Sequence, residues 1–401
     1  MVSVLTKIFG LTNIEIAEDI VHDVLLKALE SWKLKGVPEN PSAWLMAAAK
    51  NKTLDFLRHK KQEEKYARQI TPLLQSEYTI GHTLNNYFSE NEIKDDQLRM
   101  MFVCCHDSIN EESQIALILK TLCGFSVSEI AKAFLTNDST INKRLYRAKE
   151  KLRELEIKFE IPVPSEIEKR IDQVLKALYL LFNEGYSSTE GESFIREELA
   201  AEALRLCLIL SQHTAGNIPK TLALLALMYF HGARFNARID DEGNILLLKE
   251  QNRKLWDNEM IQEGIILLNM ASTGDLVSTY HIEAAIAYEH CIAKSYNDTN
   301  WKNLLNYYQV LITLTKSPVA ELNSAIVISE IDGPDAALNV IFKIELADEL
   351  KNYYLLPATK GDLYFRKSDM IKAKYFYDIA ETLTSSPFEK KLLRKKSNMC
   401  T

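Results

Sequence analysis

The chain has 401 residues, a formal net charge of −7 at pH 7 and 47% hydrophobic residues. This length and apolar content predict two or three domains, each with its own core. Because apolar residues recur every three to four positions and only 13 glycines and 10 prolines occur, we expect an all-α fold. No apolar run reaches the roughly 18 residues of a membrane span, and the start does not have the pattern of a secretion signal, so we expect a cytoplasmic location.

The six cysteines are scattered and show no CxxC spacing, which is typical of buried, reduced thiols. Cys104, Cys105 and His106 form a cluster that suggests metal binding, but adjacent cysteines do not have the usual zinc spacing. The sequence therefore predicts neither a metal site nor a cofactor. It also contains no nucleophile–base pair or phosphate loop that would indicate an enzyme.

A first helical block is expected over residues 1–68. Its first helix, 15–32, has an apolar stripe with two leucines beside it: Ile16, Ile20, Val24, Ala28, Leu25 and Leu29. A loop follows at 33–42, where Gly36, Pro38 and Pro41 break the helix. Ser42 is expected to cap a second helix, 43–68, whose far half holds seven basic and three acidic residues. This local charge, rather than the acidic total, indicates affinity for nucleic acid.

A polar linker is expected over 69–94, followed by a second block over 95–156. In that block Ser126 to Arg153 has the layout of a helix-turn-helix. Ile130, Ala131 and Phe134 give the first helix its apolar stripe, and the second has a matching stripe of Ile141, Leu145 and Ala148. Asp138 or Ser139 is the expected cap of the second helix.

The polar face of this second helix holds six basic and two acidic residues between 138 and 153. Basic side chains bind phosphates, while sequence reading would fall to residues in the first turn. The predicted first-turn readers are Ser139, Thr140, Asn142, Lys143 and Arg144, and the basic Arg147 completes the predicted DNA-binding set. A helical hairpin with a solvated basic face is the alternative.

Residues 166–401 are expected to form further helices. Between 301 and 387 the helical pairs recur at a period near the roughly 34 residues of a tetratricopeptide repeat. Two groups of mostly small residues are suited to close packing between helices. The first is Pro318, Val319, Ala320, Ala325, Ala336 and Ala337. The second is Gly361, Ala373, Tyr377 and Ala380. Stacked pairs of this kind make a concave surface that commonly binds peptides or proteins.

Charged and polar residues stand beside apolar helix faces in this half, among them His231, Arg234, Arg238, Arg253, Glu283 and His290. Buried ion pairs that fix the helix register are the favoured interpretation. A pocket for a ligand or for catalysis is the other.

Two basic helical blocks joined by a polar linker resemble a sigma factor of the extracytoplasmic-function type. The segment 17–23, AEDIVHD, is similar to the family's AEDLVQD. The family pattern P-x-x-WL-x-x-x-ARN-x-x-x-D-x-x-R is matched from Pro41 to Arg58, and T-x-x-x-RL-x-RAK from Thr140 to Lys149. Segments such as 95–106, 178–187, 226–238, 250–257 and 317–338 resemble the subgroup with a long C-terminal helical extension that is related to tetratricopeptide repeats.

The resemblance implies that the helix around 17–30 docks on the clamp of RNA polymerase, with Glu18, Asp19, His22 and Asp23 as polar contacts. It implies that the loop 33–42 and helix 43–60 open the minus-ten promoter element, through Trp44, Lys50, Asn51, Lys52, Asp55 and Arg58. Trp44 could equally be a core aromatic. The helix 138–152 would read the minus-thirty-five element with the set named above.

Three departures from the family pattern stand out. His22 replaces the usual Gln, although a neutral imidazole can still form a hydrogen bond. Lys50 replaces Arg, which keeps the charge but loses bidentate geometry. The family usually has more helix before the segment 17–23, so the first helix is expected to be shortened, through trimming or a misplaced start.

The function implied is a promoter-specificity subunit that binds core RNA polymerase and promoter DNA, with a C-terminal domain that regulates or supports its activity. Genes of the subgroup tend to sit beside genes for small DGPF-type (YCII-related) proteins, so such a protein is a candidate partner of that domain. Two alternatives remain: a helical-repeat interaction scaffold and a polymerase-independent DNA-binding regulator.

Overall fold

The computed structural model describes residues 1–60, 87–134, 136–155, 157–162, 164–187, 195–274 and 276–400, and most of these residues are helical. One isolated antiparallel bridge, Ile239 to Ile245, is the only β pairing in those ranges. The predicted all-α fold is therefore confirmed. The chain divides into two units, Met1–Ala177 and Leu178–Thr401, and the division falls within helix α10 (Pro164–Tyr186).

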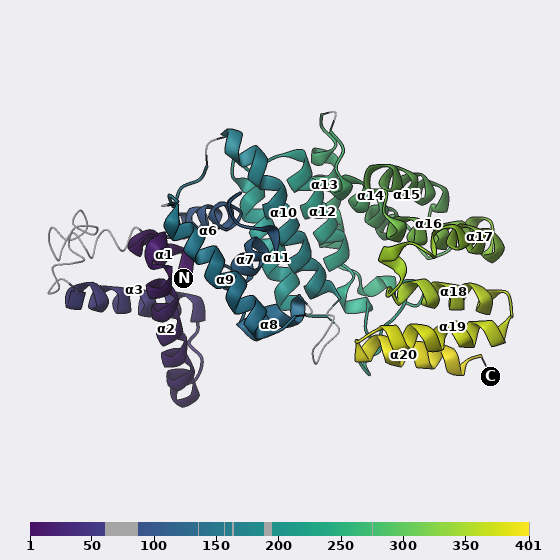
Figure 1. Ribbon diagram of the computed structural model, residues 1–401, viewed down its shortest axis with the longest axis horizontal. Helices are drawn as coiled ribbons and strands as arrows, with labels where there is room; N and C mark the ends of the chain where they lie inside the picture. Colours follow the sequence, from purple (N-terminus) through teal and green to yellow (C-terminus); the bar gives the residue numbers. More distant parts are fainter. Residues whose placement is uncertain are drawn as a thin grey trace. The chain divides into compact units, whose positions relative to one another are not determined.

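The first unit begins with helices α1 (Val2–Phe9), α2 (Ile14–Lys35) and α3 (Pro41–Lys60), drawn in purple in Figure 1. A short 3-10 turn, Leu11–Asn13, separates α1 from α2. The three helices share a core of Val4, Leu5, Ile8, Phe9, Ala17, Ile20, Val24, Ala49 and Leu57. Sequence reasoning missed α1, although its apolar residues follow a helical period.

Leu25 and Leu29, which the sequence places beside the apolar stripe of α2, are 43% and 68% exposed. One sequence-based detail of α3 needs correction. Ser42 does not cap α3, because the helix already begins at Pro41 and the side chain of Asn40 accepts a hydrogen bond of 2.9 Å from the amide of Ala43. Proline suits the first helical position because it has no amide hydrogen to satisfy.

The predicted helix end at 61–68 and most of the predicted linker, 69–86, lie outside the described residues. The structure resumes before α6 (Glu90–Cys104), which starts inside the range predicted as linker. Helices α7 (Glu111–Thr121), α8 (Val127–Ala133) and α9 (Asp138–Glu154) follow. Their core includes the fully buried Phe102, Leu117, Ile118, Ile130 and Ile141. The second predicted stripe of the helix-turn-helix is buried, and so is the first except for Phe134, which is half-buried.

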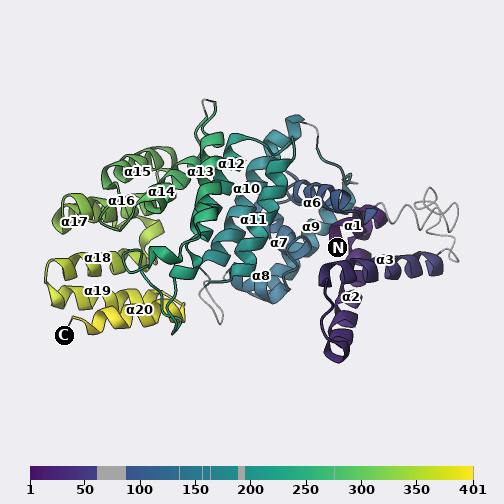
Figure 2. The same cartoon turned by 180° about the vertical axis from the view of Figure 1, so that it is seen from behind.

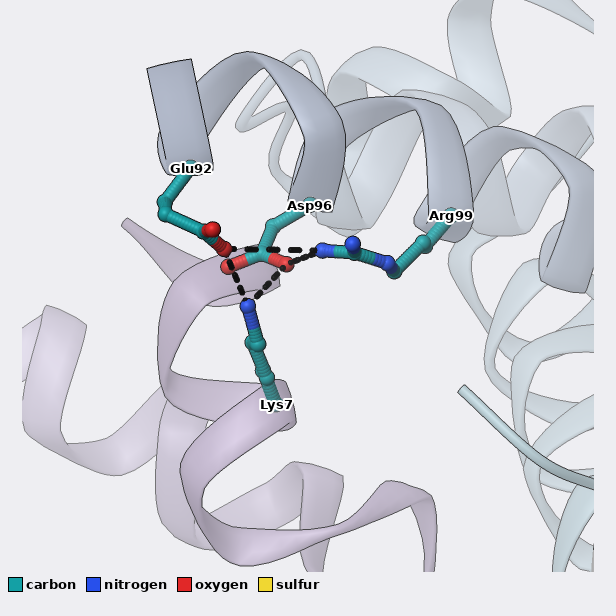
Figure 3. A network of polar contacts seen from close by, with 4 residues as sticks. All are labelled: Lys7, Glu92, Asp96 and Arg99. Atoms are coloured by element: carbon teal, nitrogen blue, oxygen red, sulfur yellow. Dashed lines mark hydrogen bonds and ion pairs between the residues drawn. The ribbon is translucent and has the colours of Figure 1, made fainter. Parts of the chain in front are cut away.

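A polar network joins α1 to α6 (Figure 3). Asp96 has a fully buried side chain, which is paired with Arg99 and lies 3.4 Å from the Nζ of Lys7. Lys7 also pairs with Glu92 at the more exposed rim. Because a buried carboxylate is costly without cations beside it, this network ties the first helical block to the second.

The second unit contains ten helices in the described ranges: α11 (Glu197–Gln212), α12 (Pro219–Gly232), α13 (Asn258–Ala271), α14 (Thr279–Ile292), α15 (Trp301–Thr315), α16 (Pro318–Ile331), α17 (Pro334–Ile344), α18 (Leu355–Arg366), α19 (Met370–Leu383) and α20 (Pro387–Asn398). Most consecutive helices pack on one another. Figures 1 and 2 show α18, α19 and α20 side by side near the C terminus.

Both predicted groups of small residues lie between packed helices of this unit. Ala325 and Ala337 are fully buried between α16 and α17. Between α18 and α19, a Cβ placed on Gly361 would stand 2.7 Å from the ring of Tyr377, so only glycine permits this close approach.

Candidate nucleic-acid interface

The second helix of the helix-turn-helix, α9, begins one residue earlier than expected from its cap. Asn137 has an extended backbone, and its side chain accepts a hydrogen bond of 2.9 Å from the amide of Thr140. Asp138 and Ser139 are therefore the first helical residues, not the cap. Asn137 is the cap because a cap side chain accepts a hydrogen bond from the amide two or three residues later in the chain.

The predicted DNA-reading residues of α9 differ in exposure. Ser139, Asn142, Lys143 and Arg147 are exposed, and Thr140 is half-buried. Arg144 is also half-buried, because it pairs with Glu112 and its guanidinium lies 5.5 Å from the centre of the Phe134 ring. The exposed four share the solvent side of a helix whose opposite side is buried.

The far half of α9 is attached to α2. Lys149 Nζ lies 2.6 Å from the Oε2 of Glu18, and Arg153 pairs with Glu15. The side chains of Lys149 and Glu18 are only 13% and 22% exposed. Two basic residues that sequence reasoning gave to DNA phosphates therefore bind carboxylates of the first helical block.

The other predicted contacts on α2 face solvent. Asp19, His22 and Asp23 are exposed, and so are the neighbouring Leu25, Leu26 and Leu29. Sequence reasoning placed Leu25 and Leu29 beside the apolar stripe and did not count them as contacts. The sequence signal that could have identified them as exposed contacts is their offset from the buried stripe of Ile20, Val24 and Ala28.

Four of the six residues predicted for the minus-ten element lie together. Trp44, Asn51, Lys52 and Asp55 line a cavity of about 330 Å³ between α2 and α3, together with Asp23 and Lys27. Lys52 Nζ lies 3.0 Å from the Oδ2 of Asp23. Trp44 is half-buried and packs edge-on against Trp32, with ring centres 5.6 Å apart. The tryptophan is thus partly a packing residue and partly a wall of the cavity.

The two remaining residues of that set lie outside this cavity. Arg58 is exposed, and its Nη1 lies 3.6 Å from the Oδ1 of Asp55. Lys50 is half-buried on another side of α3. Together with Lys52, these residues supply positive charge along the helix.

The cysteine–histidine cluster is part of the core. Cys104 and Cys105 are fully buried, and burial raises the pKa of the Cys104 thiol to about 12. His106 forms a 2.8 Å hydrogen bond with the hydroxyl of Ser108. In the described part of the chain, no three His, Cys, Asp or Glu side chains are arranged to hold a metal ion.

No helix within the described ranges combines the length and apolar character needed to cross a membrane.

Comparison with known families assigns three segments of the chain. Residues 1–63 match sigma-70 region 2, residues 99–152 match sigma-70 region 4, and residues 170–272 match a family of unknown function, DUF6596. An uncharacterized protein of Rhizobium meliloti (strain 1021) is 31% identical over 384 residues, which are 95% of this chain and 89% of that protein. No solved structure matches the chain.

The helix-turn-helix, the paired helical blocks and these matches define a sigma factor, a non-enzymatic, DNA-binding component of transcription initiation. The chain belongs to the sigma-70 family, in its extracytoplasmic-function-like form with regions 2 and 4 and a C-terminal helical extension of the DUF6596 type. Its sigma domains imply core RNA polymerase and promoter DNA as partners.

Proposed function

We propose that this sigma factor binds core RNA polymerase through the solvent-facing side of α2 and directs it to specific promoters. The observation that carries the proposal is the mixed surface of α2, where Asp19, His22 and Asp23 lie among Leu25, Leu26 and Leu29. Exposed leucines grouped with acidic residues are typical of a protein-binding surface. Glu18 would join this contact once it is released from Lys149.

The cavity between α2 and α3 is the proposed site for the minus-ten element. A base taken out of the stack needs a concave, partly aromatic pocket, and its backbone needs positive charge nearby. Trp44, Asn51 and Asp55 supply the pocket wall. Lys50, Lys52 and Arg58 supply the charge.

The exposed face of α9 is the proposed reader of the minus-thirty-five element. Asn142 and Lys143 have side chains that can pair with base edges in the major groove, while Ser139, Thr140 and Arg147 suit either base or phosphate contacts. Because Glu112 holds Arg144 against Phe134, we propose that Arg144 mainly orients the helix and contacts DNA at its edge.

The C-terminal unit is proposed to regulate or support initiation in the cytoplasm, where polymerase and DNA are found. A small DGPF-type protein is a candidate partner for it. Pull-down of such a protein by the full-length chain, but not by a chain ending at Ala177, would support that pairing. Equal capture by both chains would contradict it.

Run-off transcription with core bacterial RNA polymerase tests the proposal. The full-length protein should give a promoter-dependent transcript. Asp19→Lys should abolish this transcript, because it places a positive charge on α2 where basic groups of polymerase are proposed to bind. Glu168→Lys is the matched control, since Glu168 is an exposed acid on α10 and is not part of the proposed surface. Tight, specific DNA binding without polymerase, and no transcript, would instead favour an independent DNA-binding regulator.

A further inference from the structure

A cavity of about 470 Å³ in the second unit has no role in the proposed initiation function. It is bordered by α10, α12, α14, α15 and α16, and by the turn after α12. Its polar lining consists mainly of Tyr179, His231, Arg234, Glu283, His290 and Asn323. The volume is within the range of small-molecule sites, which are roughly 300–1,000 Å³.

Arg234 is the exceptional residue of this cavity. It is only 8% exposed, and its one hydrogen bond runs from Nε to the neutral Gln251 side chain, at 3.4 Å. Its guanidinium also lies 5.3 Å from the centre of the Trp256 ring. Within the described ranges no carboxylate forms an ion pair with it. A buried cation without an anion is costly, since desolvation is not offset by a partner.

Glu283 is the acidic residue that lines this cavity, but it does not form an ion pair with Arg234. Its carboxylate accepts a hydrogen bond of 2.9 Å from the hydroxyl of Tyr179, and burial raises its pKa. The hydroxyl of Tyr179, and not Arg234, is therefore the partner of this carboxylate. Arg234 remains without an ion-pair partner among the described residues.

Two histidines that line the same cavity each have an unpartnered ring nitrogen. The Nδ1 atoms of His231 and His290 are buried and have no hydrogen-bond partner among the described residues. Burial and neighbouring arginines lower the pKa of both side chains, to about 3 for His290, so both are neutral at pH 7. A neutral imidazole has one N–H group that can donate.

We propose that this cavity binds a small organic molecule through a carboxylate or phosphate group, with Arg234 as its counter-ion and His231 and His290 as hydrogen-bond donors. A second cavity of about 590 Å³ shares the lining residues His290, Tyr308 and Asn323. A ligand anchored at Arg234 therefore has room for an organic part beside the aromatic ring of Tyr308. The proposal concerns the second unit alone and does not depend on polymerase binding.

The test is the melting temperature of the full-length protein in inorganic phosphate and in succinate, each compared with chloride at equal ionic strength, followed by calorimetric titration with the anion that raises it. At least one anion should raise the melting temperature of the wild type. A response to phosphate alone indicates a phosphate ester, and a response to succinate alone indicates a carboxylate. No response to either overturns the proposal.

Arg234→Gln should bind that anion at least tenfold more weakly. Without anion it should melt no lower than the wild type, since it removes an uncompensated buried charge. Lys254→Gln is the matched control, because Lys254 is an exposed cation outside the cavity, and it should respond as the wild type does. Should Arg234→Gln fail to fold, Arg234→Lys keeps the charge and should retain weakened binding. Binding by the Gln variant as tight as that of the wild type overturns the assignment.

Discussion

Lys149 on the second helix of the helix-turn-helix and Glu18 on the proposed polymerase-binding helix are hydrogen-bonded at 2.6 Å, although they are 131 positions apart in the sequence. Arg153 and Glu15 form a second pair beside them. In this arrangement Lys149 occupies one carboxylate oxygen of Glu18. The proposed contact of Glu18 with polymerase would therefore compete with the attachment of α9 to α2.

Replacing Lys149 should release Glu18 and strengthen binding to core polymerase. We expect Lys149→Gln to tighten that binding about two- to tenfold, because a partly exposed ion pair contributes about 0.5–1.5 kcal/mol. The measurement is equilibrium binding to fluorescently labelled core enzyme in the absence of DNA. Lys151→Gln is the control, since Lys151 pairs within α9, with Glu154 at 3.0 Å. Equal affinities for the two variants would show that the contact does not compete.

The buried carboxylate of the network in Figure 3 should be important for stability. Asp96→Asn leaves Lys7 and Arg99 without their shared buried anion. We expect it to lower the free energy of unfolding by about 2–3 kcal/mol. Glu92→Gln, at the exposed rim, should cost less than about 1 kcal/mol. Urea denaturation of both variants measures the free energy of unfolding. Similar losses in the two variants would mean that the burial of Asp96 adds nothing to stability.

Exposed residues of α9 should separate into readers of bases and binders of phosphate. Asn142→Ala should relax preference at one position of the minus-thirty-five element, at a cost of about 1–3 kcal/mol. Arg147→Gln should instead weaken binding to all sequences. It should also reduce the slope of log affinity against log salt concentration by the amount expected for about one phosphate contact. Binding of holoenzyme to a set of single-base promoter variants at several salt concentrations distinguishes them. A uniform loss for Asn142→Ala would remove it from the reading set.

The second unit should lose stability as the pH falls below about 6.5. Burial, and then Arg234 and Arg253, lower the pKa of His290 to about 3. Because the unfolded chain takes up a proton that the folded chain excludes, His290 alone should make folding about 2 kcal/mol less favourable at pH 5 than at pH 7.5. His290→Gln should flatten this dependence in chemical denaturation. An unchanged dependence in that variant would show that His290 does not titrate on unfolding.

Local sequence patterns were enough to predict the helical architecture and the helix-turn-helix. The stripe of Ile141, Leu145 and Ala148 has the helical period, and the structure buries all three. The cap was misplaced by one residue because Asn137, Asp138 and Ser139 all have side chains suited to capping, and only the backbone conformation selects Asn137. The sequence does not decide whether Leu25 and Leu29 are buried, because an apolar residue beside a stripe is buried only if a neighbouring helix covers it.

The sequence by itself determined the class of this protein, since periodicity, caps and the residues of regions 2 and 4 are local signals that do not depend on distant contacts. Only the tertiary structure decided the partners of its charges. The favoured interpretation of the polar residues in the C-terminal half was buried ion pairs, yet Arg234 is buried without an ion-pair partner among the described residues. Lys149, which was expected to face DNA phosphates, is held by Glu18. Such pairings depend on how helices distant in sequence pack together, and residue type and spacing do not encode that arrangement.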